Sequence, residues 1–272
     1  MMEAFILLII GVFGGLIAGS MGVGGGIIFT PVLYFLFDEA GVEQPVQWSV
    51  ASGLLCTLFT SVSSSVRQYL NKNFFLKEGL LLGVFGAIGI SIGKWILTSE
   101  YYDREQFVVI FSAVLFFAAY MMFKKGKISQ EATTPDADTK FETKSAGTAG
   151  ISGGLVAALA GVGGGGVMVP IMNLIYKQPF KKAVSISHLG MCVLIATGLI
   201  QLALVSVNTQ GISPYNLGYI DIGAALPLAV GGLFGANFGT ILNHKLKQQY
   251  LQWGFALLAV VMASRLLWGV YG

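Results

Sequence analysis

Two glycine-rich stretches carry the residues best suited to bind a ligand. Residues 21–31 read MGVGGGIIFTP, and residues 160–170 read AGVGGGGVMVP. Glycine allows a positive φ and places no side chain over the backbone, so a ligand can reach the N–H groups. A helix that starts after such a stretch adds unpaired N–H groups and about half a positive charge. The pattern predicts an anion site built from backbone, with these candidates: Gly22, Val23, Gly24, Gly25, Gly26, Gly161, Val162, Gly163, Gly164, Gly165 and Gly166.

The alternative is that these glycines only allow helices to pack closely. That explanation suits the regularly spaced glycines elsewhere in the chain, which are Gly79 and Gly83, and Gly231, Gly235 and Gly239. It suits the two stretches poorly, because four or five glycines within six residues exceed what a packing face needs. A nucleotide-binding P-loop does not match either, since no Lys-Ser or Lys-Thr follows.

Both stretches belong to an internal repeat. Residues 14–31 and 153–170 align without a gap and share 10 of 18 residues, which indicates a duplication. In the next segment, Ser52-Gly53-Leu54 matches Ser187-His188-Leu189. A weaker similarity, GVFGA at 83–87 against GLFGA at 232–236, has an ambiguous register.

Three polar residues in apolar segments complete the candidate site: Ser52, Ser187 and His188. Ser52 is favoured because Ser187 matches it across the repeat. It belongs to a stripe spaced for one helix face, which either lines a path or bonds to neighbouring helices or to carbonyls of its own helix. The stripe consists of Ser49, Ser52, Cys56, Thr60 and Ser63. His188 is a costly group at membrane depth, so it either contacts the anion, carries a proton, or is a neutral core histidine bonded to a carbonyl.

The composition is that of a polytopic α-helical membrane protein. Of the 272 residues, 55% are hydrophobic and 11% are charged, against about 25% charged in soluble domains. The mean hydropathy is +0.75. The start, MMEAFILLII, lacks the basic region of a signal peptide and is expected to be the first membrane segment. The partners expected are the lipid bilayer and a small anion, with no nucleic acid and no cofactor.

Each half of the chain contains five apolar pieces. The last three of each half are long enough to span about 30 Å, whereas the first two of the first half, 4–19 and 25–37, reach only about 24 and 20 Å. The glycines fall where these two pieces meet. We therefore expect each half to be a pair of half-helices with a glycine tip inside the membrane, followed by three transmembrane helices.

The distribution of Lys and Arg predicts the topology. If each pair of half-helices returns to the side it entered, 13 of the 16 Lys and Arg are cytoplasmic, and only Lys94, Arg104 and Arg265 are not. If the chain instead made eight plain spans, 9 of the Lys and Arg residues would lie on one side of the membrane and 7 on the other, which is no bias. The first arrangement has three crossings per half, so the halves have inverted topology and both termini are extracytoplasmic. The domains expected are a first repeat (1–123), a cytoplasmic linker (124–147) and a second repeat (148–272).

The duplicated GVGGG and GVGGGG hairpins, each followed within five residues by Pro, resemble the sulfite exporter TauE/SafE family of anion permeases. The resemblance extends over essentially the whole chain. It implies the export or uptake of small sulfur-containing or organic anions, such as sulfite, thiosulfate or sulfonates, in a cell membrane.

These observations favour a secondary transporter that binds its anion at the midplane between the two glycine tips. An anion channel that uses the same loops as a fixed filter is the alternative. No Gly-x-Ser-x-Gly, no HExxH and no pair of intramembrane aspartates is present in the sequence, so an enzyme is not expected. The sequence leaves open which anion is carried, in which direction, with which coupling ion, and whether the protein forms a homo-oligomer.

Overall fold

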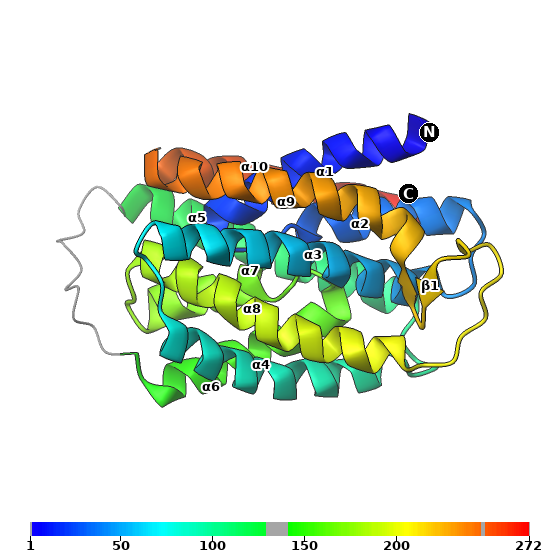
Figure 1. The fold of residues 1–272 in the computed structure, drawn as a ribbon, viewed down its shortest axis with the longest axis horizontal. Helices are drawn as coiled ribbons and strands as arrows, with labels where there is room; N and C mark the ends of the chain where they lie inside the picture. Colours follow the sequence, from blue (N-terminus) through cyan, green and yellow to red (C-terminus); the bar gives the residue numbers. More distant parts are fainter. Residues whose placement is uncertain (1, 129–140, 246–247, 272) are drawn as a thin grey trace.

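The computed structural model describes residues 2–128, 141–245 and 248–271, which form helices aligned along one long axis (Figure 1). The helices of the first half are α1 (Met2–Met21), α2 (Gly26–Glu39), α3 (Pro45–Leu70), α4 (Leu76–Leu97) and α5 (Arg104–Ile128). Those of the second half are α6 (Thr143–Ala160), α7 (Gly165–Pro170), the π-helix η1 (Ile171–Ile175), α8 (Phe180–Ala203), α9 (Ile222–Lys245) and α10 (Gln248–Tyr271). Two short antiparallel strands, β1 (Asn216–Leu217) and β2 (Ile220–Asp221), precede α9.

Six of the described helices are long and apolar enough to cross a membrane. They lie within α1, α3, α4, α5, α8 and α9. Large apolar side chains cover the outside of the bundle, among them Trp95, Phe238 and Leu257, whose exposed fractions are 82%, 64% and 69%. Such a surface suits lipid rather than water. The prediction of an all-α polytopic membrane protein is confirmed.

Two helix hairpins enter the bundle from opposite ends. Glu3 of α1 and Glu39 of α2 line the same cavity, so α1 and α2 start and finish at one end. Tyr176, directly after η1, bonds to Thr148 of α6 through its hydroxyl (3.0 Å), so the second hairpin has its open end there. Figure 1 shows both chain termini at the open end of the first hairpin and the start of α6 at the opposite end. We call these the terminal end and the linker end.

Glycines, rather than a lack of apolar length, end α1 and α6. The expectation that the first piece is 16 residues long is wrong, because α1 has 20 residues and reaches about 30 Å. The helix stops where Gly22 takes a φ of 74°, and α6 stops where Gly161 takes a φ of 65°. A left-handed residue cannot continue a right-handed helix.

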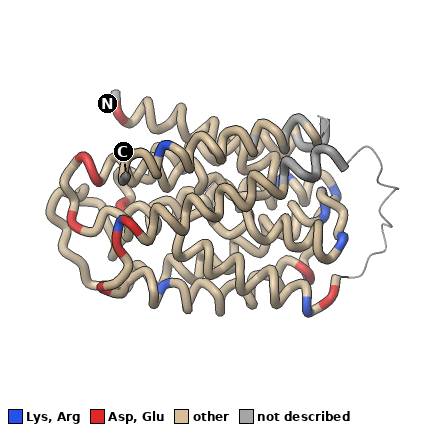
Figure 2. The backbone as a smooth tube through the Cα atoms, turned by 180° about the vertical axis from the view of Figure 1, so that it is seen from behind, with Lys and Arg blue, Asp and Glu red and all other residues tan. Residues whose placement is uncertain are grey.

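The predicted linker 124–147 is helical at both of its described ends. The helix α5 continues to Ile128, and α6 already begins at Thr143. The part of this prediction that concerns residues 129–140 lies outside the described residues. Figure 2 shows that coloured Lys and Arg residues gather mainly at the linker end, whereas Asp and Glu are concentrated at the terminal end.

The two halves interlock through glycines. The helix α1 packs along α9, and α6 packs along α4. A β-carbon on Gly15 would lie 2.1 Å from the Gly232 carbonyl oxygen, and one on Gly154 would lie 2.1 Å from the Gly86 carbonyl oxygen. These contacts fix the register that the sequence left ambiguous: Gly86 corresponds to Gly232. The alignment of 83–87 with 232–236 is therefore wrong by three residues.

Candidate functional site

The two hairpin tips contact each other in a reciprocal way. A β-carbon on Gly26 would lie 2.1 Å from the Gly161 carbonyl oxygen and 2.8 Å from the Val162 Cα. A β-carbon on Gly165 would lie 2.2 Å from the Gly22 carbonyl oxygen and 2.8 Å from the Val23 Cα. Each contact is the other one shifted by 139 residues, the offset of the sequence repeat. All residues of both tips, 22–26 and 161–166, are buried.

Several backbone donors at the tips have no partner. The N–H groups of Gly22 and Gly161 donate to the last turns of α1 and α6. Within the described part of the chain, several N–H groups make no hydrogen bond to another backbone or side-chain group: in the first tip those of Val23, Gly24 and Gly25, and in the second tip those of Val162, Gly163, Gly164, Gly165 and Gly166. Buried N–H groups are rarely left unpaired. The tips can therefore offer donors to a bound ligand, although neither tip contains a charged side chain.

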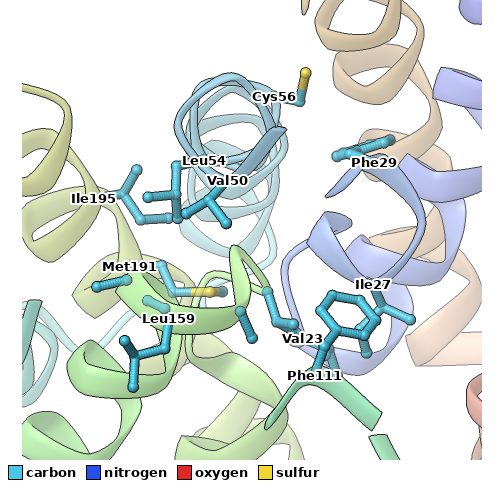
Figure 3. Close-up of a cluster of buried hydrophobic side chains, with 14 of the residues drawn as sticks. Val23, Ile27, Phe29, Val50, Leu54, Cys56, Phe111, Leu159, Met191 and Ile195 are labelled. Carbon is cyan, nitrogen blue, oxygen red and sulfur yellow. The ribbon is translucent and has the colours of Figure 1, made fainter. Parts of the chain in front are cut away.

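Thr57 of α3 and Met191 of α8 lie across both tips at once. β-Carbons on Gly24 and Gly163 would lie 2.7 and 2.5 Å from the Thr57 Cγ2 atom. The Met191 sulfur would lie 2.9 and 3.4 Å from the same two positions. Figure 3 shows Met191 and Val23 in the same cluster of buried side chains. The Thr57 methyl group is the part that contacts the tips, and its hydroxyl is buried with no hydrogen-bond partner, which leaves a side-chain donor free beside them.

The first carbonyl of each tip accepts a hydroxyl from the opposite half. Ser187 donates to the Gly22 carbonyl (3.1 Å), and Thr30 donates to the Gly161 carbonyl (3.0 Å). A β-carbon on Gly53 would lie 2.4 Å from the Thr30 hydroxyl oxygen. Thr30 on α2 thus donates a hydroxyl to the second tip, as Ser187 on α8 does to the first. The predicted site residue Ser187 does lie at a tip.

Ser52 does not lie at a tip, and its predicted equivalence with Ser187 is wrong. Its hydroxyl accepts the N–H of Asp221 (2.9 Å) at the terminal end. The contacts of Val50 with Gly161 and of Val184 with Gly22 show that α3 and α8 correspond at an offset of 134. The sequence alignment used 135. A shift of one residue turns a side chain by about 100° around a helix.

The polar stripe that contains Ser52 faces α9 and its preceding strand. Cys56 donates to the Ala225 carbonyl (3.4 Å), and Ser63 donates to the Leu233 carbonyl (2.7 Å). Ser49 and Thr60 instead donate to carbonyls of α3 itself. These contacts support hydrogen bonding within and between helices rather than a path lining. Cys56 and Cys192 do not share an environment either, because Cys192 lies 3.8 Å from the Ser65 hydroxyl.

A second polar stripe on α3, one residue further along, is not among the predicted site residues. Thr57, Ser61, Ser64 and Gln68 are fully buried, and the first two lie beside Met191 of α8. The Ser61 hydroxyl lies 4.0 Å from the Met191 sulfur. The spacing of 4, 3 and 4 residues could have revealed this stripe as readily as the first one. The match between Ser52 and Ser187 instead favours the opposite choice, the stripe that bonds toward α9.

His188 is buried beside the last turn of α1. Its ring lies by the backbone of Gly19, but neither ring nitrogen makes a hydrogen bond of normal geometry. On α8, His188 lies one turn after Val184, which contacts Gly22, and three residues before Met191. At the offset of 134, its counterpart in the first half is Leu54. Among the described residues, no group of three or more His, Cys, Asp or Glu side chains could hold a metal ion.

The terminal end of the bundle is closed over α3. The Tyr219 hydroxyl donates to the side-chain oxygen of Gln44, and the Tyr219 ring meets Trp48 edge-on at 5.7 Å. Asn208 donates to the Glu43 carboxylate (3.0 Å). Burial, and then the Glu43 charge, raise the pKa of Tyr219, so its hydroxyl stays protonated and remains a donor. These contacts hold the 204–221 segment against the start of α3.

Comparison with known proteins identifies the family of this chain. The family model described as "Sulfite exporter TauE/SafE" matches residues 7–266. "Probable membrane transporter protein MJ0441" of Methanocaldococcus jannaschii is 28% identical over 247 residues, which cover 91% of this chain and 89% of that protein. "Probable membrane transporter protein YunE" of Bacillus subtilis is 26% identical, with 98% of each chain covered. A "Probable membrane transporter protein" of Haemophilus influenzae is 28% identical and covers 96% of this chain and 98% of its own. The chain, a multi-pass helical membrane protein with two glycine hairpins meeting at its centre, belongs to the sulfite exporter TauE/SafE family.

Proposed function

We propose that this protein is a secondary transporter of small sulfur-containing or organic anions, such as sulfite, thiosulfate or sulfonates. The anion binds between the two hairpin tips. One observation carries the proposal: the tips lie against each other and bring together unpaired backbone N–H groups, with Thr57, whose buried hydroxyl has no partner, packed beside them. Donors without a nearby carboxylate favour an anion, and a family described as sulfite exporters supports the choice of a small sulfur oxyanion.

The reciprocal contacts of the tips support two halves of inverted topology. In this arrangement the hairpins enter the membrane from opposite sides and return to them, so the tips lie at the midplane. The concentration of Lys and Arg at the linker end supports a cytoplasmic linker and extracytoplasmic termini in a cell membrane. Because each hairpin returns to the side it entered, only the three remaining helices of each half cross the membrane, which is an odd number.

The site is closed in this structure, which supports a carrier that opens to one side at a time. All residues of both tips are buried. A cavity beside the first tip, lined by Val23 and Gly25 among others, has a volume of about 10 Å³, which is no larger than one water molecule requires. An anion can enter only if helices separate, as alternating access requires.

A binding screen tests the proposal. We expect sulfite, thiosulfate or a sulfonate to raise the melting temperature of the purified protein, because a ligand stabilises only the state that binds it. The same anion should accumulate in proteoliposomes at a rate that saturates with its concentration. An anion channel would instead give single-channel currents and non-saturating flux. If no anion shifts the melting temperature and none is taken up, the proposal is refuted.

A further inference from the structure

The interface between α3 and α8 differs on the two sides of the tips. Beyond Thr57 and Met191, the helices continue antiparallel toward both ends of the bundle. On the linker side the buried face of α3 carries Ser61, Ser64 and Gln68, and the facing α8 carries His188. We call this part of the interface the polar seam.

The internal repeat gives each residue of the polar seam an equivalent position in the other half, with which it can be compared. At the offset of 134, the counterparts of Ser61, Ser64 and Gln68 are Ile195, Gly198 and Leu202, and the counterpart of His188 is Leu54. These counterparts are also buried, and Figure 3 shows Ile195 and Leu54 clustered with Val50. Equivalent positions are thus polar on the linker side of the tips and apolar on the terminal side. Burial at these positions does not by itself require polar side chains, since the apolar counterparts are buried as well.

The polar seam contains donors without partners. The Ser64 hydroxyl, the Gln68 side-chain nitrogen and both His188 ring nitrogens are buried and make no hydrogen bond of normal geometry. Ser64 lies one turn from Ser61, and His188 lies one turn from Met191, and Ser61 touches Met191. Because the helices are antiparallel, Ser64 and His188 lie at a similar depth. Unpaired buried donors are costly and need an acceptor.

A basic mouth and an asparagine close the seam at the linker end. Arg67 is in the last turn of α3, and Lys181 and Lys182 begin α8. Between them, the Asn73 side chain donates to the Gln68 side-chain oxygen (2.9 Å) and to the Lys181 carbonyl (3.2 Å). Ser185 donates to the Asn73 carbonyl (2.5 Å). Asn73 therefore ties α3 to α8 where the seam would meet water.

We propose that the polar seam is the route by which an anion passes between the linker side and the hairpin tips, and that Asn73 is its gate. The inference rests on the proposed function and adds the path and its gate. The neutral donors of Ser64, Gln68 and His188 replace the hydration of the anion along the way. The basic mouth raises the anion concentration at the gate. The equivalent apolar residues on the terminal side block the anion there until α3 and α8 separate.

Cysteine labelling tests the route in the full-length protein, with Cys56 and Cys192 replaced by alanine. Ser64→Cys places a thiol in the seam, and the adjacent Ser63→Cys is the matched control, because Ser63 faces α9. We expect an anionic, membrane-impermeant methanethiosulfonate reagent to label Ser64→Cys from the linker side and to leave Ser63→Cys unlabelled. Adding Asn73→Ala should speed labelling at position 64 by about 5- to 30-fold, the population change expected from one or two lost hydrogen bonds.

The results separate the route from the proposed function. Ser185→Ala removes another bond of the same gate, so it should accelerate labelling in the same direction. A cationic reagent of similar size should react more slowly than the anionic one. Equal labelling at positions 63 and 64 in a protein that still takes up an anion would overturn the route alone. Gated labelling at position 64 with no anion bound or transported would overturn the function and keep the route. Denatured samples must react fully in every variant.

Discussion

Gly165 lies so close to Gly22 that a β-carbon on Gly165 would be 2.2 Å from the Gly22 carbonyl oxygen. The pair belongs to opposite halves of the chain and joins the two hairpin tips. No side chain can be accommodated there without moving backbone, because real β-carbon contacts essentially never fall below 3.0 Å. The contact therefore makes the geometry of each tip depend on the other.

Gly165→Ala should destabilise the protein and abolish anion binding. Forcing an extra methyl group into a packed site costs about 1–3 kcal/mol, which lowers the melting temperature. Gly166→Ala is the control, because its β-carbon would meet only side-chain methyl groups, of Val23 at 3.3 Å and of Val162 at 3.7 Å. The first half already carries Ile27 at the equivalent position. Equal melting temperatures and affinities for the two variants would contradict the packing of the tips.

Thr57→Val should weaken anion binding without lowering stability. The Thr57 hydroxyl is buried with no partner, so removing it is neutral or slightly stabilising to the free protein. A lost hydrogen bond to the anion should reduce affinity by about tenfold. Thr60→Val is the matched control, since the Thr60 hydroxyl bonds to its own helix at the Thr57 carbonyl. Unchanged affinity in Thr57→Val, measured by titration calorimetry, would remove Thr57 from the site.

Thr30→Val should cost about 1 kcal/mol of unfolding free energy, because the Gly161 carbonyl loses its hydroxyl donor. Adding Gly53→Ser should restore much of this loss. The double variant moves the hydroxyl from α2 to α3, which is the arrangement of the second half, where Val169 and Ser187 stand. Gly53→Ser alone should be destabilising, since its β-carbon would lie 2.4 Å from the Thr30 hydroxyl oxygen. A double-mutant cycle with no coupling would show that the two sites are independent.

His188→Leu should leave a folded protein that transports poorly. Leucine is the residue at the equivalent position 54, so it suits the apolar packing of this helix pair. Proteoliposome uptake and the melting temperature should be measured together. A lower melting temperature with normal uptake would instead assign His188 to a structural bond with the Gly19 backbone.

A cysteine in the predicted linker should react with an impermeant reagent only in inside-out vesicles. Ser129→Cys, with both native cysteines replaced, provides this probe. Thr209→Cys provides the opposite control, because Thr209 is exposed in the loop at the terminal end. Labelling of Ser129→Cys from outside intact cells would reverse the proposed orientation.

The sequence determined the class of the protein, the extent of the glycine tips and the family. These follow from signals along the chain: apolar length, glycine runs that cannot continue a helix, and a repeat of 139 residues around Gly22 and Gly161. It also identified Ser187 and His188 as unusual polar residues in an apolar helix. Such features are local, so no neighbour is needed to read them.

Only the tertiary structure decided which polar residues face the tips. Ser52 and Thr57 are on the same helix, yet Ser52 accepts a hydrogen bond from the Asp221 N–H, whereas the Thr57 methyl group contacts both tips. The sequence alignment placed α3 against α8 one residue out of register and chose Ser52. On a helix an error of one residue rotates the side chain by about 100°, so the facing partner changes completely. Partners such as Gly26 and Gly161 are far apart in the chain, and their contact depends on how the interlocked halves pack.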